Sequence, residues 1–153
     1  MQSKVIRSLG EMGIWADFFV ENLIKGLDKA LIIGLSGELG SGKTAFVQSV
    51  AKVFKIKNYI TSPTFVIQKR YKINLPTGRQ VVESGFENLI HIDAYRLESG
   101  DELLNLGWGE IVKNPKNIIF IEWPERVNEV LDKDMKMIHF KFIDEKTREV
   151  IFD

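Results

Sequence analysis

The stretch Gly37–Thr44, with the sequence GELGSGKT, constrains the fold of this chain more than any other. It matches the phosphate-binding P-loop pattern G-x-x-x-x-G-K-[ST]. An apolar run with the length of a buried strand precedes it, and residues 44–54 follow with apolar side chains at helical spacing. This strand–loop–helix context favours a nucleotide-binding loop over a glycine turn that binds nothing.

The chemistry of such a loop gives each residue type a role. Glycines let the backbone wrap around a phosphate without Cβ clashes, and the helix that follows adds unpaired N–H groups and the positive end of its dipole. We expect Lys43 to act on the outer phosphates and the Thr44 hydroxyl to ligate Mg²⁺. The residues expected to bind nucleotide in this loop are Gly37, Glu38, Leu39, Gly40, Ser41, Gly42, Lys43 and Thr44.

Apolar runs that end in turns or acids predict the rest of the sheet. Leu31–Leu35, Leu89–Asp93 and Ile118–Ile121 read as buried strands, whereas Met137–Ile143 and Arg148–Phe152 flank a turn and read as an antiparallel pair. This order predicts an α/β fold of the P-loop NTPase type. It is a three-layer sandwich with a mostly parallel central sheet, helices on both faces and antiparallel edge strands.

The other expected elements rest on local signals. A capping box at Ser8 and Glu11 predicts a helix that runs to about Lys25, with Gly26 as its C-cap. The further predictions are strands over Ser3–Ile6 and Phe65–Tyr71, a long hairpin connection over Lys72–Asn88, a helix that starts at a second capping box in Ser99–Glu102 and is broken by Gly107 and Gly109, and a short helix over Glu125–Leu131.

Length and composition limit the function classes. A chain of 153 residues suits one domain spanning residues 1–153, and its zero net charge argues against tight, autonomous binding to nucleic acid. Cysteine is absent, so the chain forms no disulfide and no thiolate metal site. No stretch approaches the roughly 20 apolar residues that span a bilayer. We expect a cytoplasmic protein without a membrane partner.

Two acidic residues at strand ends are candidates for the second magnesium ligand that a P-loop site needs. Glu122 follows four consecutive large apolar residues and is favoured, while Asp93 follows an alternating strand and is the alternative. A strand-end Asp often only caps the next turn, and both acids can contribute. His91 and His139 lack metal-ligand spacing and read as strand residues.

A hydroxyl-rich segment, Thr61-Ser62-Pro63-Thr64, interrupts the pattern after the P-loop helix. Pro63 restricts Ser62 to extended geometry. Three hydroxyls on a stiff segment can face a phosphate or its Mg²⁺, or they can bond to their own backbone in a turn. The residues alone leave both readings open.

Four blocks in this order, GELGSGKT, TSPTF, HIDAYR and IEWP, resemble the TsaE (YjeE-type) family over nearly the whole chain. Members are small bacterial P-loop ATPases that work with TsaB and TsaD in making N6-threonylcarbamoyladenosine (t6A) at position 37 of tRNA. The resemblance implies ATP or ADP and Mg²⁺ as ligands, the TsaB–TsaD complex as partner, and contact with tRNA only through that complex. The connection 73–87 is longer than the family's hairpin, which puts the geometry of that loop in doubt.

The resemblance also implies roles for individual residues. Lys43, Asp93, Glu122 and Thr64 belong to the catalytic site, with Thr44 and Glu122 as the metal ligands. Ser62 resembles part of a switch segment facing the γ-phosphate, Trp123 lies beside the site, and Ser8 and Arg148 flank the base. No arginine stands out as the one that completes the site, with Arg70, Arg96 and Arg126 all possible. We therefore expect weak hydrolysis without a partner.

Two other functions share the P-loop. A small-molecule kinase needs an acceptor pocket and usually an arginine-bearing lid, and this sequence shows no such lid. A non-catalytic, nucleotide-gated binding module would change its affinity for a partner without hydrolysing ATP in the cycle. Both remain alternatives to the ATPase.

Overall fold

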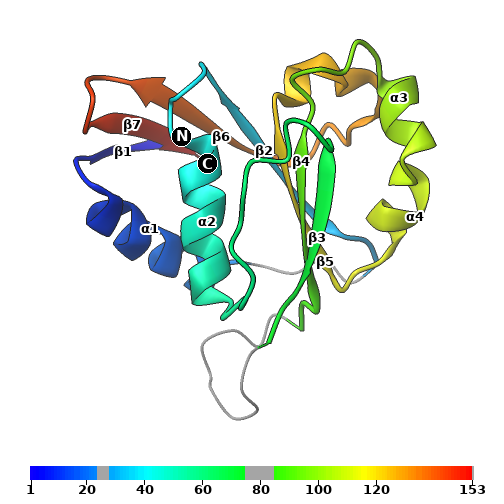
Figure 1. The fold of residues 1–153 in the computed structure, drawn as a ribbon, viewed down its shortest axis with the longest axis horizontal. Coiled ribbons are helices and arrows are strands. Elements are labelled where there is room, and N and C mark those ends of the chain that lie inside the picture. The colour runs from blue at the N-terminus through cyan, green and yellow to red at the C-terminus, as the bar shows by residue number, and fades with distance from the viewer. Residues whose placement is uncertain (24–27, 75–84, 153) are drawn as a thin grey trace.

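The structure is a computed structural model that describes residues 1–23, 28–74 and 85–152, and its framework is one seven-stranded sheet. The strand order is β1-β7-β6-β2-β5-β4-β3 (Figure 1). Strands β6, β2, β5 and β4 are mutually parallel. At one side β7 pairs antiparallel with β6 and β1 with β7, and at the other side β3 pairs antiparallel with β4. The strands are β1 Gln2–Ile6, β2 Leu31–Gly37, β3 Gln68–Lys72, β4 Asn88–Asp93, β5 Asn117–Glu122, β6 Lys136–Phe142 and β7 Arg148–Phe152.

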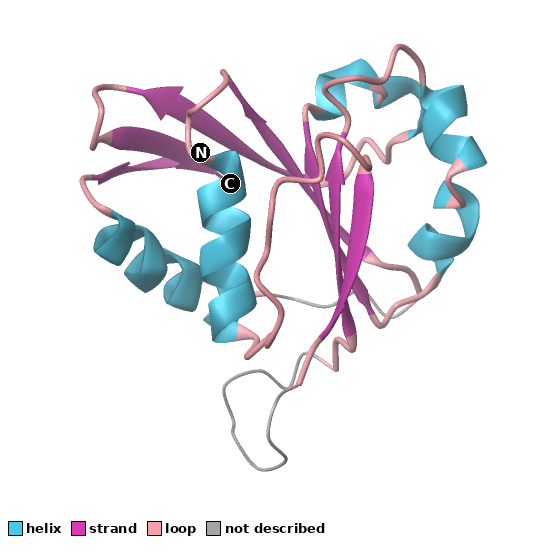
Figure 2. Ribbon diagram, in the orientation of Figure 1, coloured by secondary structure: helices cyan, strands magenta, loops and turns pink. Residues whose placement is uncertain are grey.

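Helices cover both faces of the sheet, which gives three layers (Figure 2). Helices α1 (Leu9–Glu21) and α2 (Lys43–Val53) pack on one face, and α3 (Gly100–Asn105) and α4 (Trp108–Lys113) on the other. The predicted three-layer α/β fold, with parallel central strands and antiparallel edges, is confirmed. Among the described residues, no helix combines the length and apolar character needed to cross a bilayer.

The alternation of side chains along the central strands divides the core into two halves. In β5, Ile118 and Phe120 point towards α1 and α2, and Ile119 and Ile121 point towards α3 and α4. All six residues of β5 are buried, as expected for a parallel strand covered on both faces. Glu122 therefore ends the strand on the same face as Phe120, beside α2.

Aromatic rings fill the half of the core under α1 and α2. Phe46 of α2 is fully buried, and its ring centroid lies 4.5 Å from that of Trp15 and 5.2 Å from that of Phe19. Phe120 and Phe140 of the sheet lie 6.0 and 5.8 Å from it. The helix that carries Lys43 and Thr44 is thus fixed to the sheet by this cluster.

Replacing Phe46 by alanine is expected to lower the free energy of unfolding by about 3–5 kcal/mol, because it leaves a cavity among four other rings. Urea denaturation followed by circular dichroism measures the change. Phe18→Ala is the matched control, since Phe18 is 51% exposed on α1. Equal losses from the two variants would contradict the central place of Phe46 in the core.

Several predicted boundaries are wrong for local reasons. Helix α1 ends at Glu21 and not near Lys25, because the Asn22 side chain donates to the Phe18 carbonyl (2.7 Å) and closes the last turn. Gly26, the predicted C-cap, lies outside the described residues, as does the turn at 76–78. The strand predicted over Phe65–Tyr71 begins only at Gln68.

Positive φ values and 3₁₀ geometry explain the other differences. Ile67 has φ +65°, which no strand residue adopts, and this delays the start of β3. Gly107 (φ +85°) separates α3 from α4 as predicted, but Gly109 lies inside α4. The helix predicted over Glu125–Leu131 is two 3₁₀ turns, Pro124–Arg126 and Asn128–Val130.

Candidate functional site

The carboxyl ends of β2, β5 and β4 bring the predicted site residues together. Leu35 of β2 pairs with Glu122, and Glu122 pairs with Asp93. The P-loop follows β2 directly, so its glycines, Glu122 and Asp93 all lie at the carboxyl end of the parallel strands. Open parallel sheets bind ligands at this end of their strands.

The P-loop backbone has the geometry that its glycines predict. Gly37 has φ +146°, and a Cβ there would lie 2.5 Å from the Phe140 carbonyl oxygen and 2.7 Å from Ser41 Oγ. Gly42 has φ +105° and precedes the first turn of α2. Ser41 Oγ is buried and has no hydrogen-bond partner within the described ranges. The loop is therefore packed closely against β6 and holds the buried hydroxyl of Ser41, which has no partner among the described residues.

Lys43 is held against this loop, with only 4% of its surface exposed. Its Nζ donates to the carbonyls of Gly37 (2.6 Å) and Glu38 (2.8 Å) and lies 4.4 Å from the centroid of the Trp123 ring. Burial lowers the pKa of the Lys43 ammonium, and the charges of nearby carboxylates, Glu122 first, oppose that shift. A desolvated cation of this kind is stabilised further by any anion that enters.

Thr44 and Glu122 link the P-loop helix to β5. Thr44 Oγ1 donates to Glu122 Oε1 (2.7 Å), and His91 Nε2 lies 2.8 Å from the same oxygen. Glu122 is 4% exposed and His91 is fully buried. The pair of oxygens predicted to ligate Mg²⁺ is thus adjacent, although the two residues come from opposite halves of the sequence.

Asp93, unlike Glu122, accepts its hydrogen bonds from residues other than Thr44. Its Oδ1 accepts from the Tyr95 amide (2.9 Å), which is the turn-capping role that the sequence left open, and its Oδ2 accepts from Thr64 Oγ1 (2.7 Å). Ser62 Oγ and Thr64 Oγ1 are 2.6 Å apart. The hydroxyl segment is therefore tied to the carboxyl end of β4 by the bond between Thr64 and Asp93. Glu122, and not Asp93, is thus the strand-end acid that contacts Thr44.

Trp123 follows Glu122 in a backbone conformation that is rare for a bulky residue. Its φ is +58°, and its amide donates to the Leu35 carbonyl (3.1 Å), which turns the chain back over β2. The ring lies against Lys43 on one side and 5.1 Å from the Tyr95 ring on another. Strained backbone of this kind is concentrated at functional sites.

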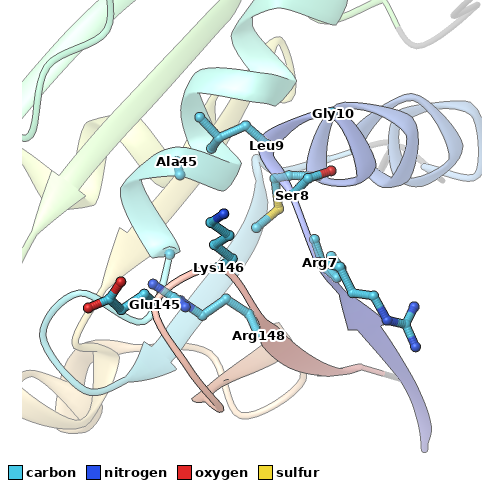
Figure 3. A pocket seen from close by; sticks show the side chains of 11 residues that line it. Arg7, Ser8, Leu9, Gly10, Ala45, Glu145, Lys146 and Arg148 are labelled. Atoms are coloured by element: carbon cyan, nitrogen blue, oxygen red, sulfur yellow. The ribbon is translucent and has the colours of Figure 1, made fainter.

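A separate pocket of about 570 Å³ lies between the N-terminal ends of α1 and α2 and the start of β7. Figure 3 shows Leu9 at the start of α1 reaching towards Ala45 of α2, with Lys146 of the β6–β7 turn and Arg148 at the start of β7 below them. The structure thus places Ser8 and Arg148, both predicted to flank the base, around one cavity. Ser8 Oγ is also the N-cap acceptor for the Glu11 amide (3.1 Å), as its capping box predicted.

Arg148 reaches the P-loop itself. Its Nη2 donates to the Gly40 carbonyl (3.1 Å), and its Nε is buried without a partner in the part of the chain that the structure describes. The three arginines that the sequence singled out lie elsewhere. Arg96 stacks on Phe65 and Arg126 on Tyr95, while Arg70 is exposed on the edge strand β3.

The donor set suits a hard cation held partly by a ligand. Hydroxyl and carboxylate oxygens are the ligands that Mg²⁺ prefers, and it is commonly bound by one or two such groups together with substrate phosphates. Within residues 1–23, 28–74 and 85–152, no three His, Asp or Glu side chains are grouped closely enough to hold a metal on their own. A cation at Thr44 and Glu122 therefore fits only with further oxygen ligands, such as phosphates.

Sequence reasoning missed one residue of this site. His91 is a strand residue as predicted, but its ring contacts Glu122. The available signal was its position two residues before Asp93, because alternate residues of a strand share a face. The partner on the next strand could not be read from that spacing.

Comparison with known proteins gives consistent matches over most of the chain. Residues 16–150 match the family model of the threonylcarbamoyl adenosine biosynthesis protein TsaE. The chain is 35% identical over 135 residues to the TsaE of Rickettsia typhi, a match that covers 88% of this chain and 82% of that protein. It is 34% identical to the TsaE of Aquifex aeolicus (86% and 80% covered) and 31% identical to that of Bacillus subtilis (79% and 68%). The crystal structure of Bacillus subtilis YdiB has the same fold, with a TM-score of 0.70, 22% identity, and 99% of this chain and 83% of that chain covered.

Proposed function

Since the chain belongs to the TsaE family of tRNA threonylcarbamoyladenosine biosynthesis proteins, we propose that it binds ATP with Mg²⁺ and hydrolyses it slowly in support of t6A synthesis. The proposal combines the family's role in tRNA modification with the contacts of Lys43, Thr44 and Glu122 at the P-loop. We favour an ATPase over a kinase because the sequence shows no arginine-bearing lid of the kind that small-molecule kinases usually carry.

The contact between Thr44 Oγ1 and Glu122 Oε1, 2.7 Å apart, is the observation that carries the proposal. A P-loop hydroxyl and a strand-end carboxylate are the two protein groups that hold the cation in nucleotide hydrolases of this class. Their adjacency supports Thr44 and Glu122 as the residues that hold Mg²⁺. The ion, when bound, neutralises charge on the phosphates.

The remaining groups have roles that follow from their positions. The P-loop amides and the Lys43 ammonium stabilise negative charge on the phosphates during transfer. Asp93 and Thr64, joined by a 2.7 Å hydrogen bond, orient the attacking water, with Ser62 beside them. The cavity lined by Ser8 and Arg148 takes the adenine base, and Trp123 covers the Lys43 side of the site.

A partner completes the site in this proposal. Arg96 and Arg126 are stacked on aromatic rings, and Arg148 reaches only the Gly40 carbonyl on the side of the base pocket. We place the missing contribution in the TsaB–TsaD complex, with tRNA contacted only through that complex and the assembly located in the cytoplasm.

Phosphate release from ATP tests the proposal directly. We expect slow, Mg²⁺-dependent release by the chain alone and a clear rise when TsaB and TsaD are added. Turnover faster than about ten per second by the isolated chain would contradict the need for a partner, because such rates normally require an arginine finger. Transfer of the phosphoryl group to a nucleoside or small acid in place of water would favour the kinase.

A further inference from the structure

His91 is a buried polar residue in an otherwise apolar layer of the sheet. Its side chain is fully buried, and its neighbours on the same face of β4 and β5, Leu89, Ile118 and Phe120, are fully buried as well. Its Nε2 lies 2.8 Å from Glu122 Oε1. An ionised carboxylate only accepts hydrogen bonds, so a bond between these two atoms requires the hydrogen on Nε2 when Glu122 is the acceptor.

Stability alone does not account for an imidazole at this position. Its second nitrogen, Nδ1, is buried and has no hydrogen-bond partner anywhere in the described chain. A buried polar atom without a partner costs free energy that an apolar side chain of similar size would avoid. The single hydrogen bond to Glu122 is therefore the property that distinguishes His91 from the leucine or phenylalanine that the layer would otherwise accept.

That hydrogen bond fixes how Glu122 is presented. Thr44 Oγ1 and His91 Nε2 both bond to Oε1, and no hydrogen bond among the described residues uses Oε2. With Oε1 held from the helix on one side and from β4 on the other, the carboxylate cannot rotate freely about its last side-chain bond. Oε2 is then the oxygen left for a cation or its water.

We propose that His91 is a positioning residue that orients the Glu122 carboxylate for divalent-cation binding at the P-loop. The inference rests on the proposed function, in which Thr44 and Glu122 hold Mg²⁺. Groups that hydrogen-bond to a metal ligand typically change metal affinity by about 10- to 100-fold when they are removed. His91 acts through Glu122 and touches neither nucleotide nor cation itself.

Two amide replacements separate positioning from simple polarity. Glutamine places its Nε2 donor near the position of the histidine Nε2, so His91→Gln should keep the bond to Glu122. Asparagine is shorter and cannot reach that oxygen. His139, exposed on β6, gives the matched control pair His139→Gln and His139→Asn.

Binding of Mn²⁺, a paramagnetic stand-in for Mg²⁺, in the presence of ADP is the readout, followed by electron paramagnetic resonance. We expect His91→Asn to raise the dissociation constant of Mn²⁺ about tenfold or more, and His91→Gln to stay within about threefold of the parent chain. ADP affinity in EDTA, measured by calorimetry, should be the same in all five proteins. Long-range ¹⁵N–¹H correlation spectra of the parent chain should show the His91 hydrogen on Nε2.

Three results would overturn the inference. His91→Asn that binds Mn²⁺ like the parent chain, an imidazole without hydrogen on Nε2, or equal weakening in both His91 variants each shows that His91 does not position Glu122. A parent chain that binds ADP but no Mn²⁺ instead removes the proposed metal site, and the inference falls with it. The spectrum of the imidazole is independent of metal, so it tells the two failures apart.

Discussion

Replacing Lys43 by alanine is expected to reduce ATP hydrolysis by at least about 100-fold, the loss typical when one preorganised group that stabilises transition-state charge is removed. Lys43 is 4% exposed, and its ammonium is held by two carbonyls of the loop. A water-exposed cation elsewhere cannot replace a charge that is already buried against the loop. Phosphate release under saturating Mg²⁺-ATP, alone and with TsaB and TsaD, measures the effect.

Lys52→Ala is the control for this variant. Lys52 lies on the same helix, is exposed, and is near the helix C-terminus, so its loss should change the rate by less than about twofold. A Lys43→Ala protein that keeps its fold by circular dichroism and hydrolyses ATP at the parent rate would remove the P-loop from the mechanism.

Glu122→Gln is expected to lower hydrolysis by about 100-fold while ATP binding persists. The amide keeps the size of the side chain and an acceptor for Thr44 and His91, which lie 2.7 and 2.8 Å from Oε1. It removes the negative charge that a divalent cation requires. Phosphate release and binding of a fluorescent ATP analogue, measured on the same preparation, separate the two effects.

Glu110→Gln provides the matched control, because the Glu110 side chain is 88% exposed on α4. The same Glu122→Gln protein also tests the gating module. We expect t6A formation in the reconstituted system to be lost together with hydrolysis. If t6A formation continues while hydrolysis is abolished, ATP binding alone serves the cycle and the gating module is correct.

The fold was predictable because its signals are local. A P-loop between an apolar run and a helical pattern fixes β2 and α2, and strand-end acids mark the ends of β4 and β5. The boundaries that failed depend on single backbone angles or contacts. The φ of +65° at Ile67 and the Asn22 bond to the Phe18 carbonyl leave no periodic trace in the sequence.

The sequence predicted which residues gather at the candidate site, but not which of their side chains contact one another. Thr44 was predicted as a metal ligand from its motif, and Glu122 was favoured over Asp93 from the apolar strand before it and from the family resemblance; the structure brings the two residues into contact. The ring of His91 and the reach of Arg148 to Gly40 are contacts between elements distant in sequence. Such contacts follow from register and side-chain length, which a single sequence does not encode in any short pattern.

The place of β2 in the middle of the sheet bears on how the protein is made. Leu31 pairs with Ile118 and Ile33 with Lys136, so the strand that leads into the P-loop has neither neighbour until most of the chain exists. Non-local pairing of this kind slows folding and leaves apolar strands open for longer. On the ribosome, the first half of the chain therefore carries the whole GELGSGKT motif next to an apolar strand that is still unpaired, and we expect that strand to be open to chaperones. The strand gains its neighbours only when β5 and β6 have been made.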